Sequence, residues 1–201
     1  MPFNLAFMLD GGTGVVTPGS QDYTTPGTYS FTVPNYNTLT VDVKGAGGGG
    51  GESGWVYGAG NAGTDGGSST FQTSTQCIGN GGTKGTGGNI TSGGKEGDTY
   101  TAGVNGTNGT ASGPSGSTNT TGGGAAGGAG GISGSGASNA SGGNGAAGGR
   151  CQKTWNIGDV GAPTPGATIT VTVGTKGVGG SGTAGVDGNS GTDGSVAISW
   201  T

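Results

Sequence analysis

The chain has 201 residues, 57 of them glycine, a formal net charge of −4 and no histidine. Glycine is about four times as frequent as the roughly 7% of ordinary proteins. Apolar residues make up only 27% of the chain, so hydrophobic burial can stabilise no more than a small core. The few, scattered basic residues argue against nucleic acid as a partner, and no apolar run is long enough for membrane insertion.

Residues 1–13 are expected to form an N-terminal docking segment, followed by a single domain over residues 14–201. The segment has neither the basic start nor the small-residue cleavage site of a secretory signal. Its apolar residues alternate as in a strand that could be added to the sheet of a partner chain, and we expect it to dock there through Phe3, Leu5, Phe7 and Leu9.

Two alternating stretches, 27–34 and 38–44, then predict half-buried strands. Their inward sets would be Tyr29, Phe31 and Val33, and Leu39, Val41 and Val43. Pro34, Asn35 and Asn37 carry turn chemistry between them, which predicts an antiparallel hairpin. A shorter pattern at 69–73 indicates a further strand.

Glycine-rich excursions follow at about 45–67, 79–150 and 174–194, and their glycines recur at every third position over long stretches. The last excursion shows the period most strictly, at Gly182, Gly185, Gly188, Gly191 and Gly194. Three residues per turn is the period of the polyproline-II helix, and only seven prolines are present, which disfavours collagen. The period therefore predicts short polyglycine-II helices packed through their glycine edges, with a disordered linker as the alternative.

Two more alternating stretches lie in the last third of the chain. Residues 165–174 place Ile169, Val171 and Val173 on one face, and residues 194–201 do the same with Val196, Ile198 and Trp200. The predicted fold is therefore mainly β: a small antiparallel β-sandwich with a projecting bundle of polyglycine-II helices and essentially no α-helix.

An ordered set of motifs resembles a known family. TYSFTVP (28–34) followed by LTVDVKGAGGGGG (39–51) is similar to the glycine-rich domain of bacteriophage tail and tail-fibre proteins. TITVTVG (168–174) and DGSVAISW (193–200) look like that family's last strands. The resemblance covers nearly the whole chain after the first dozen or so residues.

The resemblance implies a structural virion protein of the tail tip or tail fibre, made in the host cytoplasm. Packed polyglycine-II helices would carry loops that bind a bacterial surface receptor, either a polysaccharide or an outer-membrane protein. Other tail or fibre proteins would be its partners, and it would be a homotrimer or a monomer on a trimeric fibre. Alternatives are a purely architectural tail or capsid component, and an ice-binding protein built on polyglycine-II helices.

The larger aromatics outside the strand patterns fall where the glycine runs are interrupted, so we expect them on loops. Exposed rings beside polar residues suit receptor binding, although rings at such places could instead cover the end of a glycine bundle. The receptor-binding candidates are Trp55, Tyr57, Tyr100, Lys153, Trp155 and Asn156.

Cys77 and Cys151 are the only cysteines and flank the long central excursion. A reducing host cytoplasm favours free thiols, whereas a virion outside the cell permits a disulfide, so both states stay open. No enzymatic activity is expected, because a Ser or Cys nucleophile usually needs a nearby base and the chain has no histidine. No cofactor or metal site is expected either.

Overall fold

The computed structural model describes residues 15–55, 58–71, 77–91, 99–132, 140–183 and 185–201. Within these ranges the chain is mainly β, with two antiparallel sheets and no helix, and thus no helix that could cross a membrane. The strands are β1 (Gly19–Tyr23), β2 (Gly27–Thr32), β3 (Thr38–Lys44), β4 (Ser69–Phe71), β5 (Cys77–Gly79), β6 (Asn89–Thr91), β7 (Thr99–Thr101), β8 (Ala111–Ser112), β9 (Thr118–Thr120), β10 (Arg150–Asn156), β11 (Thr168–Val173) and β12 (Ser195–Trp200).

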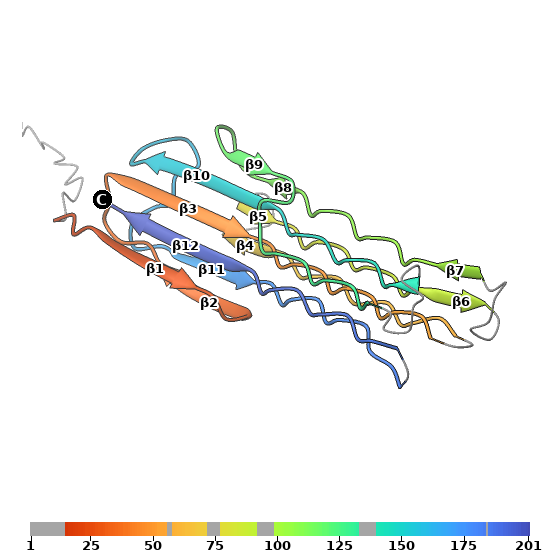
Figure 1. Ribbon diagram of the computed structural model, residues 1–201. Coiled ribbons are helices and arrows are strands. Elements are labelled where there is room, and N and C mark those ends of the chain that lie inside the picture. The colour runs from red at the N-terminus through yellow and green to blue at the C-terminus, as the bar shows by residue number, and fades with distance from the viewer. Residues whose placement is uncertain (1–14, 56–57, 72–76, 92–98, 133–139, 184) are drawn as a thin grey trace, which may run out of the picture.

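Each of the two main sheets has five strands. The first runs in the order β1-β12-β3-β10-β9 and the second in the order β2-β11-β4-β5-β8. β6 and β7 form a separate pair at the far end of the molecule (Figure 1). Strands from both ends of the sequence therefore meet in the same sheets.

Alternating side chains of both sheets make one core, as the sequence predicted. β3 shows the pattern most clearly, with Leu39, Val41 and Val43 fully buried and the residues between them half-buried. Of the predicted core residues only Tyr29 and Trp200 are partly exposed. The structure adds core residues that the alternation did not indicate, namely Tyr23, Tyr36, Phe71, Cys77, Cys151 and Trp155.

The predicted hairpin between residues 27–34 and 38–44 is wrong. β2 pairs with β11 in one sheet, whereas β3 pairs with β10 and β12 in the other. The connection crosses from sheet to sheet, and its Tyr36 is buried with its hydroxyl donating to the carbonyl of Pro163 over 2.6 Å. Because β2 and β3 lie in different sheets, they cover the shared core from opposite sides. Two strands of one hairpin would cover it from the same side only.

The glycine-rich excursions run side by side away from the sheets (Figure 1). We call their straight parts the glycine segments: residues 45–54, 58–67, 80–88, 102–110, 124–131, 140–149, 174–182 and 185–194. The 79–150 excursion is not continuous, because β8 and β9 return to the sheets within it.

Backbone hydrogen bonds join the glycine segments, and the central one, 45–54, is buried throughout. Three successive N–H groups bond to three different segments: Gly48 donates to Ala146, Gly49 to Thr64 and Gly50 to Asn189, each over 2.9 Å. The carbonyls of the same glycines accept from three further segments, through the N–H groups of Gly128, Gly85 and Gly180. The backbone N–H and C=O groups of these three glycines are thereby all satisfied by other segments, without a hydrogen bond inside their own segment.

Short polar side chains replace the missing backbone partners at the outside of the bundle. The N–H of Val104 donates to the hydroxyl of Thr86 and that of Val178 to the hydroxyl of Thr64 (2.6 and 2.7 Å). The N–H of Gly130 similarly donates to the Asn144 amide oxygen over 2.8 Å. These contacts explain why the outer segments contain Thr and Asn between their glycines.

Candidate functional site

The molecule has two ends with different chemistry. We call the tips of the glycine segments the distal end; it comprises 52–55, 58–61, 88–91, 99–102, 131–132, 140–142, 181–183 and 185–187. The proximal end carries the connection between β10 and β11, residues 157–167, together with the C-terminus (Figure 1). Of the predicted binding residues that the structure describes, Trp55 and Tyr100 lie at the distal end, whereas Lys153, Trp155 and Asn156 lie on β10.

Exposed apolar side chains gather at the distal end, where Trp55 is 45% exposed and Ile132 and Val186 are exposed as well. Backbone bonds hold their segments together: Ser53 donates to the carbonyl of Val186 (2.9 Å), and Gly131 donates to that of Gly51 (2.8 Å). The three side chains therefore stand on the tips of three adjoining segments. A rigid backbone holds apolar groups at this end in contact with solvent.

The β6–β7 pair lies beside these tips. Ile90 is buried and Tyr100, its partner across the pair, is half-buried. An isolated bridge between Ala59 and Asn89 ties the pair to the neighbouring segment. Tyr100 is thus at the distal end as Trp55 is, while Tyr57 lies outside the described residues.

A buried carboxylate organises the distal end. Glu52 is only 3% exposed, and its two oxygens accept hydrogen bonds from the N–H groups of Asn61 (2.8 Å) and Gly185 (3.1 Å). The neighbouring Ser53 hydroxyl accepts from Val186 over 2.8 Å. These bonds satisfy buried polar atoms and join three segments at their tips.

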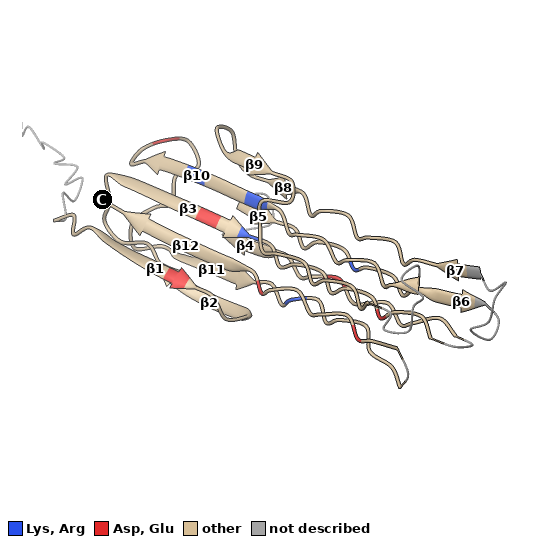
Figure 2. Cartoon of the chain, in the orientation of Figure 1, with Lys and Arg blue, Asp and Glu red and all other residues tan. Residues whose placement is uncertain are grey.

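Charged residues are few and scattered along the chain (Figure 2). The described residues of the distal end include Glu52 and Asp187 but no Lys or Arg. The strongest ion pair lies instead on the first sheet, where the guanidinium of Arg150 donates two 2.8 Å hydrogen bonds to the Asp42 carboxylate. These bonds raise the pKa of Arg150 and partial burial opposes them.

Trp155 is not a loop residue, which corrects the sequence prediction. It belongs to β10, is 1% exposed, and packs against Phe71 with ring centroids 6.1 Å apart. Its strand pairs with β3 along its whole length, which turns Cys151 and Trp155 towards the core. The interrupting Lys153 hid this alternation in the sequence.

Lys153 and Asn156 lie on the same strand, away from the distal end. The Lys153 ammonium donates to the carbonyl of Ser115 over 2.7 Å and lies 5.9 Å from the centre of the Trp155 ring. Asn156 is exposed at the end of the strand. Neither side chain is brought near Trp55 or Tyr100. The N-terminal candidates Phe3, Leu5, Phe7 and Leu9 lie outside the described residues.

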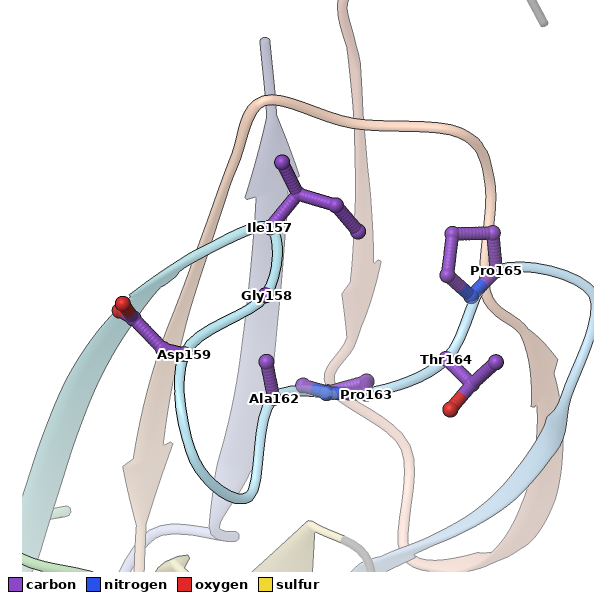
Figure 3. Close-up of a pocket in the computed structure, with 7 residues that line it drawn as sticks. All are labelled: Ile157, Gly158, Asp159, Ala162, Pro163, Thr164 and Pro165. Atoms are coloured by element: carbon purple, nitrogen blue, oxygen red, sulfur yellow. The ribbon is translucent and has the colours of Figure 1, made fainter. Parts of the chain in front are cut away.

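The proximal end contains a pocket of about 370 Å³ in the β10–β11 connection. Ile157 and Pro165 flank its opening, with Ala162 and Pro163 between them, whereas Asp159 points away (Figure 3). The N–H of Ile157 is bonded to the carbonyl of Asn37 and that of Ala162 to Asp159 (2.9 and 3.0 Å). No pattern in the sequence indicated this concave, largely apolar site.

Comparisons of the chain with protein-family models, with curated proteins and with solved structures find no match.

Proposed function

We propose that this protein is a structural component of a phage tail tip or tail fibre whose distal end binds a receptor on the bacterial surface. Exposed Trp55, Ile132 and Val186, held on the tips of a hydrogen-bonded glycine bundle, are the observation that carries the proposal. Aromatic anchors on a rigid support contribute disproportionately to recognition.

The proposed architecture is a β-sandwich from which a bundle of polyglycine-II helices projects. The backbone hydrogen bonds support this architecture. Successive residues of a segment bond to different neighbouring segments, and every third residue bonds to the same one, as expected for polyproline-II helices with three residues per turn. Such a bundle needs glycine wherever one backbone contacts another. The bundle thus holds the tips of the glycine segments away from the sheets without needing a core of apolar side chains.

The sheets then serve attachment and the tips serve recognition. The motif resemblance supports other tail or fibre proteins as partners and the virion as the location. In this role no catalytic group is required, and binding strength depends on the few side chains at the tips.

The test measures adsorption of the purified protein to host cells, after a host has been found by screening bacterial strains. Trp55→Ala should leave the protein folded and weaken adsorption by at least about tenfold, as expected for an anchor worth about 1.4 kcal/mol or more. Ile132→Ala tests in the same way whether the tip of a second segment contributes to adsorption. The matched control is Val104→Ala, an exposed apolar residue on the side of the bundle.

Equal adsorption of the parent, Trp55→Ala and Ile132→Ala would reject the distal end as the receptor site. A purely architectural role in the tail or capsid would then be the better interpretation. Circular dichroism and melting of each variant exclude loss of folding as the cause of any change.

A further inference from the structure

We propose that the proximal pocket binds the apolar N-terminal segment, residues 3–9, of the same chain. The pocket would take alternate side chains from Phe3, Leu5, Phe7 and Leu9. This inference does not depend on receptor binding at the distal end. It concerns the isolated protein, before any partner is bound.

The first support is the apolar surface left open at the proximal end. Ile157 at the rim of the pocket is 51% exposed, Val160 in the same connection is fully exposed, and Val15 is 88% exposed. The pocket volume, about 370 Å³, is within the range of sites that enclose small ligands. An apolar occupant would remove this surface from water.

The second support is the rigidity of the pocket. The Tyr36 hydroxyl donates a hydrogen bond to the carbonyl of Pro163, and the backbone N–H groups of Ile157 and Ala162 are also hydrogen-bonded. Two prolines, Pro163 and Pro165, restrict the far wall. A site that is ordered before binding loses little conformational entropy when it is filled.

The third support is the place where the segment leaves the sheet. Gly19, Trp200, Leu39 and Trp155 lie in one row across β1, β12, β3 and β10. Three strand spacings of about 4.8 Å therefore separate the start of β1 from the end of β10, a distance of roughly 14 Å. The indole N–H of Trp200 donates to the carbonyl of Thr17 over 2.9 Å, which fixes the exit point at this end.

The chain is long enough to cross that distance. Six residues from Val15 to Leu9 can span up to about 20 Å at about 3.3 Å per residue. Gly11 and Gly12 between them give the chain backbone freedom to adjust its path. A tethered segment has a high effective concentration at its own pocket, which favours it over the segment of a second copy.

The experiment is amide hydrogen exchange of the full-length protein, followed by mass spectrometry over a wide range of protein dilution. Peptides covering residues 3–9 should exchange at least about tenfold more slowly in the parent than in Ile157→Asp, which places a charge at the pocket rim. Val104→Asp is the control at another exposed apolar site, away from the pocket, and it should leave exchange of residues 3–9 unchanged. Leu5→Asp places a charge in the segment itself and should also remove the protection.

Two results would overturn the proposal. Protection that grows with protein concentration, together with a larger mass in solution, would assign the pocket to the segment of a second copy. Fast exchange of residues 3–9 at every concentration, in protein whose β3 amides are protected, would show that the pocket does not bind the segment in the isolated chain.

Discussion

Cys77 and Cys151 form a disulfide that joins the two sheets through the core, linking β5 to β10 with 5.6 Å between their Cα atoms. Both residues are completely buried. The bond closes a stretch of chain with a sequence separation of 74, which includes several of the glycine segments.

Removing this bond should destabilise the protein by about 4 kcal/mol, because it releases the loop-closure entropy of the unfolded chain. Denaturant unfolding of the parent with and without reductant measures the loss. The double variant Cys77→Ala/Cys151→Ala should be insensitive to reductant. A parent whose unfolding midpoint does not change on reduction would contradict a stabilising disulfide.

Gly48→Ala should destabilise the glycine bundle by at least about 3 kcal/mol, or prevent folding, through overpacking. An added Cβ would overlap the carbonyl group of Thr83 on the neighbouring segment. Gly158→Ala is the control: its added Cβ would meet no atom of a non-neighbouring residue within 4 Å, and only its positive φ of +88° is unfavourable, so it should cost about 1–2 kcal/mol. Thermal unfolding compares them, and equal losses would refute close backbone packing at Gly48.

Trp155→Ala should cost about 3–5 kcal/mol of stability, because it leaves a large cavity beside Phe71. The same change at half-exposed Trp55 should stay within about 0.5 kcal/mol. Chemical denaturation of the two variants distinguishes the buried ring from the exposed one. Similar losses at both positions would mean that Trp55 also belongs to the packed structure.

Tyr23→Phe and Tyr36→Phe should differ although both rings are buried. The Tyr36 hydroxyl donates to Pro163, so its removal should cost about 1 kcal/mol. The buried Tyr23 hydroxyl has no hydrogen-bond partner within the described ranges, so its removal should be neutral or stabilising. Paired urea titrations measure the difference, and a larger loss at Tyr23 would reverse this interpretation.

Stability should fall as the pH rises above about 10. Burial raises the pKa of Tyr23 and of Tyr36 above the ordinary 10.0, and the negative charge of Asp159 raises that of Tyr36 further. The two tyrosine hydroxyls therefore lose their protons at a lower pH in the unfolded chain than in the folded one. Their contribution to the free energy of unfolding is complete below pH 10 and is lost as the pH rises above it. Unfolding midpoints at neutral and alkaline pH measure this loss, and Tyr23→Phe/Tyr36→Phe should show less of it. An alkaline loss of equal size in the double variant would assign it to other groups.

The alternation of β3, β11 and β12 and the three-residue glycine period could be interpreted locally, because each reflects a repeat of the backbone itself. The same local reasoning expected a loop position for Trp55, where the ring could be exposed or could cover the end of a glycine bundle, and this ring is 45% exposed. The prediction failed for Trp155, since Lys153 between two inward residues makes β10 look polar.

The sequence by itself determined which stretches are strands with one apolar face and where glycine must stand, because those patterns depend on neighbours along the chain. Only the tertiary structure decided that β2 and β3 lie in different sheets, that Cys77 meets Cys151, and that most of the exposed large apolar residues lie at two opposite ends. These features depend on pairing between residues far apart in the sequence, such as Leu39 with Trp155 and Gly19 with Trp200. Local periodicity specifies the face that a strand must bury, but several partners could bury it, and packing of the whole core selects one.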